Sequence, residues 1–272
     1  MIPKLGKKSN GCFILPTNQL TNDNFKSTKK NFTKKINEDL NPQDWIPNHQ
    51  FGFWQAHSRV KQCHRITDTN NKAMENQQYC TAAFLDVSQA FDKVWHPGLL
   101  LKIKRILPSS YFNLLKSYLN ECQFETKING ETSSCFHILS GVSQGAFLVL
   151  FSMRYTHIWP TSRKTLGTFA DAAIFATHED PMIASLNLQE HLHKIKKWLK
   201  KWKIKVNESK TSQITFTLRK GYCPAVNINQ TIIRQTEVVK YLGLHFDCRF
   251  NWKEHRQRKK TNRIKNKRST GW

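Results

Sequence analysis

The clearest pattern along the chain is an apolar run that ends beside an acidic residue. Thr81 to Val87 contains β-branched and aromatic residues between turn-like flanks, which predicts a buried strand in a mixed or parallel sheet. Asp86 lies at its C-terminal end, the edge at which open α/β sheets bind ligands, and a desolvated carboxylate there needs a cation. On these residues alone, however, helix capping by Asp86 and Ser88 explains the pattern better.

A second acidic residue lies between two short apolar runs. The segment Leu166 to Thr177 reads LGTFADAAIFAT, which predicts a hairpin with Asp171 at its tip. Two aspartates on neighbouring strand ends can share a divalent cation. Because magnesium prefers a few carboxylates together with substrate phosphates, the pair Asp86 and Asp171 indicates phosphoryl or nucleotidyl transfer.

Local patterns predict the surrounding scaffold. Helices are expected over residues 99–107 and 111–121, and Asn129 with Gly130 predicts a type I′ hairpin. Val238 to Asp247 reads as two strands that pivot at Gly243. A helix is also expected over residues 181–202, with lysines opposite an apolar stripe that comprises Ile183, Leu188, Leu192, Ile195, Leu199 and Trp202.

The charge of the chain indicates its partners. The 272 residues include 43 Lys and Arg and 19 Asp and Glu, which gives a net charge of +24. So large a basic excess indicates a polyanion, most simply nucleic acid, and an ordinary solvated basic surface is the lesser alternative. Residues 256–268 are nearly all basic and polar, which predicts a disordered segment, a nuclear-localisation patch or an electrostatic arm.

Cysteine usage and hydropathy bear on the compartment. The seven cysteines form no CxxC pair and no cluster with zinc spacing. Without a signal peptide, they indicate reduced thiols in the nucleus or cytoplasm and not a secreted protein. No apolar run approaches the length of a membrane span.

Five segments resemble, in order, the motifs of the reverse transcriptases of non-LTR retrotransposons, in particular jockey-like elements. They are FLDVSQAFDKVWHPGLL, SGVSQGA, GTFADAA, NESKT and VVKYLGLHFD. The resemblance implies an α/β polymerase palm with an antiparallel-rich sheet, helices packed on one face and partial fingers. The domains expected are a partly disordered fingers remnant over residues 1–50, the palm over 51–255 and a basic tail over 256–272.

The resemblance implies catalytic roles for three residues. Asp86 and Asp171 would hold two Mg²⁺ ions. Lys210 would protonate the leaving pyrophosphate, although a surface lysine beside a strand explains it equally well.

The resemblance also implies how substrates bind. Phe91 would exclude a ribose 2′-hydroxyl, and Gln144 with Gly145 would lie under the nascent base pair. The primer grip would comprise Tyr241, Leu242 and Gly243. The expected partners are an RNA template, a DNA primer and a deoxynucleoside triphosphate (dNTP).

Several motifs depart from the family. Its FADD motif reads FADA here, so Ala172 stands in place of the second aspartate, and Trp54 stands where the family carries an arginine. Replacing a residue that only supports metal ligands typically lowers metal affinity or activity by roughly 10–100-fold, and losing a ligand itself should lower them further. We therefore expect a shortened, damaged copy of an RNA-directed DNA polymerase that is catalytically impaired. The alternatives are a non-catalytic, basic nucleic-acid-binding protein derived from a transposon and a relic that does not fold stably.

Overall fold

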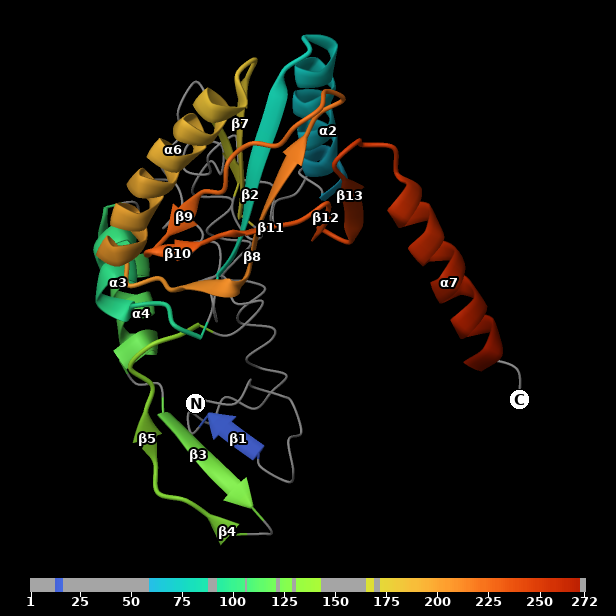
Figure 1. Cartoon of the computed structure of the whole chain (residues 1–272). Helices are drawn as coiled ribbons and strands as arrows, with labels where there is room; N and C mark the ends of the chain where they lie inside the picture. Colours follow the sequence, from blue (N-terminus) through green and yellow to red (C-terminus); the bar gives the residue numbers. More distant parts are fainter. Residues whose placement is uncertain are drawn as a thin grey trace. The chain divides into compact units, whose positions relative to one another are not determined.

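The chain forms two compact units whose segments alternate along the sequence. The structure is a computed structural model, and it describes residues 13–16, 59–87, 92–105, 107–120, 123–128, 131–142, 165–168 and 172–269. The first unit contains the elements β1 (Phe13–Pro16), α3 (His96–Lys104), α4 (Ser109–Asn120), β3 (Gln123–Ile128), β4 (Glu131–Thr132) and β5 (Phe136–His137). The second unit contains the other elements (Figure 1).

The first unit confirms the local predictions that fall on it. The two predicted helices are confirmed in α3 and α4, which begin three and two residues earlier than expected. Strands β3 and β4 pair antiparallel, with Ile128 opposite Glu131, so the predicted hairpin is confirmed, while its turn residues lie outside the described part of the chain.

The second unit is built on a five-stranded sheet with the strand order β11-β8-β2-β7-β6. The strands are β2 (Tyr79–Val87), β6 (Thr165–Thr168), β7 (Ala172–His178), β8 (Val206–Phe216) and β11 (Arg234–Gln235). The central strand β2 pairs antiparallel with β7 and β8, β6 pairs antiparallel with β7, and only β11 runs parallel to its neighbour. The sheet is therefore mixed and antiparallel-rich, as predicted, and the hairpin predicted over residues 166–177 is confirmed in β6 and β7.

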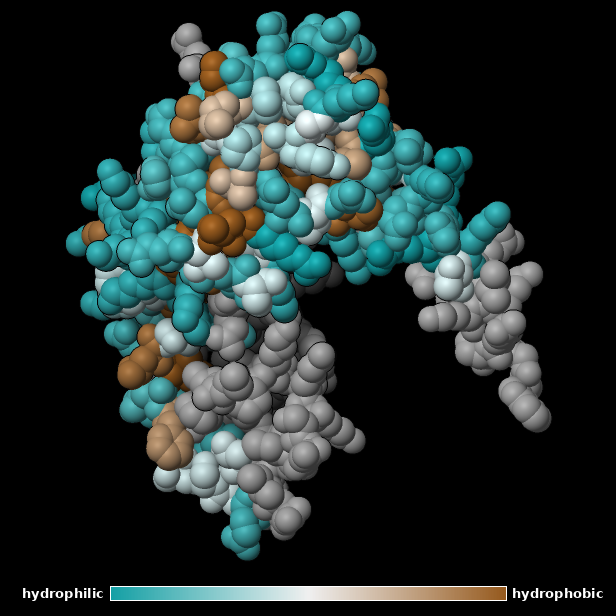
Figure 2. Space-filling model, viewed as in Figure 1, coloured by the Kyte–Doolittle hydropathy of each residue, from teal (hydrophilic) through white to brown (hydrophobic). Residues whose placement is uncertain are grey.

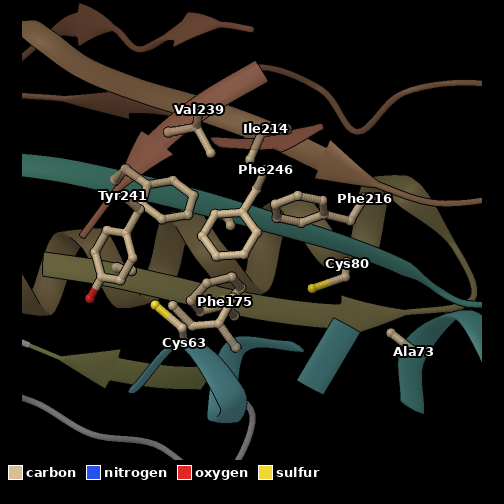
Figure 3. Close-up of a cluster of buried hydrophobic side chains, with 13 residues drawn as sticks. Cys63, Ala73, Cys80, Phe175, Ile214, Phe216, Val239, Tyr241 and Phe246 are labelled. Carbon is tan, nitrogen blue, oxygen red and sulfur yellow. The ribbon is translucent and has the colours of Figure 1, made fainter. Parts of the chain in front are cut away.

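One face of this sheet packs on a helix and a hairpin. Successive residues of a strand point to opposite faces, and Cys80, Ala82 and Phe84 of β2 all belong to the same buried cluster. The cluster includes residues of α2 (Arg59–Glu75) and of the hairpin formed by β12 (Val238–Tyr241) and β13 (Leu244–Asp247) (Figure 3). The hairpin and α2 together cover this face.

Helix α6 (Pro181–Lys201) covers the opposite face, where its Ala184 packs with Tyr79 of β2. The prediction that helices pack on one face only is therefore wrong, because β2 is apolar on both faces and each face needs a cover. Within α6, Ile183 is 40% exposed, against the prediction that it faces the core. Neighbouring helical residues point about 100° apart, and Ala184 takes the position that faces the sheet.

A buried amide lies between the sheet and the segment after β8. Gln213 Nε2 donates to Thr81 Oγ1 and to the carbonyl of Pro224, both at 3.0 Å, and its Oε1 accepts from the backbone N–H of Val226 at 2.9 Å. Ser185 of α6 donates to the same Pro224 carbonyl at 2.8 Å. These bonds fasten the segment between β8 and β9 (Asn227–Ile228) to the sheet and to α6.

The remaining elements are the strand β10 (Thr231–Ile232) and the C-terminal helix α7 (Lys253–Ser269). Disorder was one reading of the basic tail, and it is wrong because the backbone here is helical. None of the helices within the described ranges is both long and apolar enough to cross a membrane.

We predict that Gln213→Leu lowers the free energy of unfolding by about 2–3 kcal/mol, because the buried N–H of Val226 loses its acceptor. Urea unfolding followed by circular dichroism measures the change. Gln257→Leu, at an exposed position of α7, is the control and should stay within about 0.5 kcal/mol of the parent protein. Equal stability of the two variants would contradict the role of the buried amide.

Candidate functional site

A pocket of about 240 Å³ lies at the C-terminal end of β2. Strand β2 is buried from Tyr79 to Leu85, and burial stops at Asp86, which is partly exposed. Four of the five predicted motifs meet in the pocket although they are far apart in sequence. Its lining comprises Phe84, Leu85, Asp86, Ala172, Lys210, Ser212, Val239, Lys240, Tyr241, Leu242 and Gly243.

The pairing of β2 with β7 brings two motifs to this pocket. The last pair in the described register is Leu85 with Ala172, and each of these residues is the sequence neighbour of a predicted aspartate. Asp86 follows Leu85 and lines the pocket, whereas Asp171 lies outside the described residues. Ala172 is 1% exposed and contributes a methyl group where the related motif has a carboxylate.

Lys210 lies in a bulge of β8 and lines the pocket. Phe84 pairs with Ser212, but Asp86 pairs with Asn207, so residues 208–211 stand opposite Leu85 alone. Such bulges redirect side chains and are common beside active sites. Thr211 Oγ1 donates to the carbonyl of Asn207 at 2.9 Å and closes the bulge, while the exposed Lys210 lines the pocket.

The bulge is also held from outside the sheet. The hydroxyl of Thr231 and the side-chain amide of Asn229 donate to the carboxylate of Glu208 at 2.8 and 3.2 Å. These two hydrogen bonds, the one from Thr231 first, lower the pKa of Glu208. The predicted strand patterns did not include this bulge, and the polar run NESK ahead of the apolar residues of β8 was the only signal of it in the sequence.

The turn between β12 and β13 forms the opposite wall of the pocket. Tyr241 pairs with Leu244 across a two-residue turn, and both turn residues have positive φ, 48° at Leu242 and 87° at Gly243. This is the type I′ geometry that suits a hairpin. The ring of Tyr241 meets Phe84 edge-on, with centroids 5.1 Å apart, and so fixes the turn over the end of β2.

The other predicted substrate residues, Phe91, Gln144 and Gly145, lie outside the described part of the chain. Their motifs nevertheless meet in the first unit through neighbouring residues that sequence reasoning missed. His96 Nε2 donates to the carbonyl of Gly141 at 2.7 Å, and the N–H of Gly141 donates to the carbonyl of Val94 at 2.9 Å.

Only glycine suits the position of Gly141 in this contact. Its φ is +97°, and a Cβ added there would lie 2.8 Å from the backbone oxygen of Asp92. The pattern HPG followed much later by SG gives no sequence signal that these segments touch. In the part of the chain that the structure describes, no three His, Cys, Asp or Glu residues gather as a metal site.

Comparison with known sequences finds a consistent set of relatives. A family model described as reverse transcriptase (RNA-dependent DNA polymerase) matches residues 19–246. The RNA-directed DNA polymerase from mobile element jockey of Drosophila melanogaster is 36% identical, over 77% of this chain and 24% of that protein. Relatives from transposon X-element and transposon BS of the same species are 35% and 34% identical, over 79% and 81% of this chain and 25% and 26% of their own length. The chain spans about a quarter of the length of these curated relatives.

Comparison with solved structures bears on the fold. Telomerase from Candida tropicalis, solved with the TWJ fragment of telomeric RNA, matches with a TM-score of 0.53 and 13% sequence identity, over 82% of this chain and 36% of that chain. At this identity the match shows the fold alone. It confirms the mixed α/β fold of the polymerase palm type that the sequence predicted.

We predict that Gly243→Ala lowers the free energy of unfolding by about 1–2 kcal/mol, because alanine resists the left-handed backbone of this turn. A clash is not the cause, since an added Cβ meets no atom within 4 Å. Gly243→Asn is the control and should cost less, because asparagine tolerates this conformation. Thermal unfolding compares the two variants, and equal losses would contradict a backbone origin.

Proposed function

Because the chain belongs to the reverse transcriptase (RNA-dependent DNA polymerase) family, we propose that it forms the palm of an RNA-directed DNA polymerase of a non-LTR retrotransposon. One observation carries the proposal: Asp86, Lys210 and the turn at Leu242 and Gly243 come from three separate motifs and line one pocket. The proposed partners are an RNA template, a DNA primer and a dNTP. We further propose that this copy is catalytically impaired.

The pocket fits a divalent ion of the kind this family generally uses. Asp86 is a partly exposed carboxylate at the end of a buried strand, and Mg²⁺ commonly takes one or two protein carboxylates and leaves its other positions to phosphates and water. The described pairing of β2 with β7 ends with Leu85 opposite Ala172. This pairing favours Asp86 and Asp171, the next residue of each segment, as the two protein ligands of the ion. When bound, Mg²⁺ would activate the primer 3′-hydroxyl and stabilise the charge of the triphosphate.

Residues of the chain supply the proton transfer and the contacts to the substrates. Lys210 lies in the bulge and lines the pocket, from where its ammonium group can donate a proton to the leaving pyrophosphate. On the opposite wall, Tyr241, Leu242 and Gly243 hold the primer end toward Asp86. Phe91 rejects a ribose 2′-hydroxyl, while Gln144 and Gly145 support the nascent base pair.

The impairment follows from the lining of the same pocket. Ala172 is buried there with a methyl group where the family motif has a second carboxylate. Asp86 and Asp171 would then hold the ions with fewer charged ligands. Removing a residue that only supports metal ligands typically lowers metal affinity or activity by roughly 10–100-fold, and losing a ligand should lower them further. Trp54 in place of an arginine weakens substrate contacts independently.

We predict that the purified chain extends a DNA primer on an RNA template weakly or not at all, with either Mg²⁺ or Mn²⁺. The family motif reads FADDTAIFA, and this chain reads FADAAIFA, one residue shorter. Replacing Ala172 with Asp-Thr restores both the aspartate and the missing residue, and it should give at most weak recovery because the other motifs remain damaged. Gel analysis of extended primers measures both.

The matched control is Asp86→Asn in the restored chain. It should abolish any recovered extension, because an amide cannot replace the negative charge that the ions need. Robust extension by the unmodified chain would overturn the impairment, and extension that persists without the Asp86 carboxylate would overturn the assignment of the site.

A further inference from the structure

Helix α7 has little apolar surface with which to pack on the rest of the chain. Residues 253–261 are all polar or charged, and the part of the helix in view in Figure 2 is hydrophilic. A helix that is polar all round is not held by a core, so its attachment depends on contacts at its ends and on ion pairs. The contacts of its first turn therefore determine how α7 is held on β13.

Two histidines meet at this first turn. His245 belongs to β13 and His255 to α7, and their ring centroids lie 6.0 Å apart. The backbone N–H of His245 donates a hydrogen bond to Nδ1 of His255 at 3.4 Å. The ring of Trp252 lies edge-on to His255, with the centroids 6.0 Å apart. One imidazole of α7 therefore contacts both the backbone of β13 and the residue that precedes the helix.

The hydrogen bond to His255 requires a neutral ring. An imidazole nitrogen accepts a hydrogen bond only while it carries no proton, and both ring nitrogens of a protonated histidine are donors. Nδ1 of His255 can therefore accept from His245 only when its ring is neutral and carries its proton on Nε2. Proton uptake at Nδ1 turns this attraction between β13 and α7 into two N–H groups that face each other.

The ring of His245 also resists a proton. Its Nδ1 is buried and has no hydrogen-bond partner in the part of the chain that the structure describes. A charged ring in this position would be desolvated without a compensating hydrogen bond. Burial is accordingly the largest cause that lowers the pKa of His245.

Positive charges on the elements packed against β13 act in the same direction. Lys240 lies directly opposite His245 in the pairing of β12 with β13, so the two side chains share one face of the hairpin. Arg258 and His255 approach from α7. All three lower the pKa of His245 further.

The nearby carboxylates are already engaged. Glu254 of α7 raises the pKa of His245, but it pairs with Arg258 at 2.6 Å. The carboxylate of Asp247, two residues along β13, accepts the backbone N–H groups of Asn251 and Trp252 at 3.0 and 2.9 Å. Neither carboxylate is therefore left over to stabilise a second positive charge at His245.

We propose that the contact between His245 and His255 is a pH-sensitive latch, which holds the first turn of α7 on β13 while both rings are neutral. The docked state binds fewer protons than the released state. The latch therefore contributes its full stability above the ordinary histidine pKa of about 6.5 and loses it as the pH falls below this value. Lys240, opposite His245, lines the pocket of the candidate site, so the latch bears on that wall.

Hydrogen–deuterium exchange of the full chain at pH 7.5 and 5.5 tests the latch. After correction for the intrinsic effect of pH on exchange, the amides of residues 251–256 should lose protection by up to about tenfold at pH 5.5. The reason is that a free histidine is protonated about ten to one at one pH unit below its pKa. The amides of β2 are the internal control and should keep their protection. Equal protection of residues 251–256 at both pH values, or an equal loss in β2, overturns the proposal.

A double variant identifies the titrating groups. His245→Phe keeps an aromatic ring without a titrating nitrogen, and His255→Asn keeps a side-chain acceptor that carries no proton. This variant should show no loss of protection at residues 251–256 at pH 5.5, although it retains Glu254 and Asp247.

The matched control is His64→Phe with His193→Asn, at two exposed histidines of α2 and α6. It should keep the pH dependence of the parent chain. A loss in the double variant as large as in the parent would assign the effect to other groups and overturn the proposal. If circular dichroism shows that a variant is unfolded, exchange in the parent chain still decides the outcome. None of these measurements depends on catalysis, so failure of primer extension leaves them unaffected.

Discussion

Burial of strand β2 on both faces is the constraint on which the second unit depends. From Tyr79 to Leu85 every residue of the strand is buried, so its backbone groups must bond to β7 and β8 and each face must be covered. Helix α6 covers one face, and α2 with the β12–β13 hairpin covers the other. The candidate site is a consequence of this arrangement, because the hairpin that seals the core also ends beside Asp86.

Irregular backbone shapes the site at the point where burial stops. The pairing of β8 with β2 shifts between Phe84 and Asp86, and Lys210 lies in the resulting bulge over residues 208–211 and lines the pocket. The turn at Leu242 and Gly243 uses left-handed backbone to close a short hairpin over the same place. Both irregularities lie in sequence motifs that resemble the polymerase family, so the motifs encode local geometry as well as chemical groups.

Much of the fold was predictable because its signals are local. Neighbouring residues alone indicate the apolar strand β2, the hairpin at Asn129 and Gly130, and the periodic helix α6. The errors arose where a neighbour decides the outcome. Ile183 has the hydropathy of a core residue but lies beside the position that faces the sheet. The helix of the basic tail begins at a cap to which Asp247 of β13 and Asn251 contribute.

The sequence by itself determined the family, the order of its motifs, the basic charge and the alanine at position 172. These are properties of residue identity and spacing along one chain. Only the tertiary structure decided that Asp86, Lys210 and Gly243 line one pocket, that His96 bonds to Gly141, and that both faces of β2 are covered. The physical reason is that strand register, bulges and the faces chosen by helices are set by contacts between distant segments, which no local pattern of residues records.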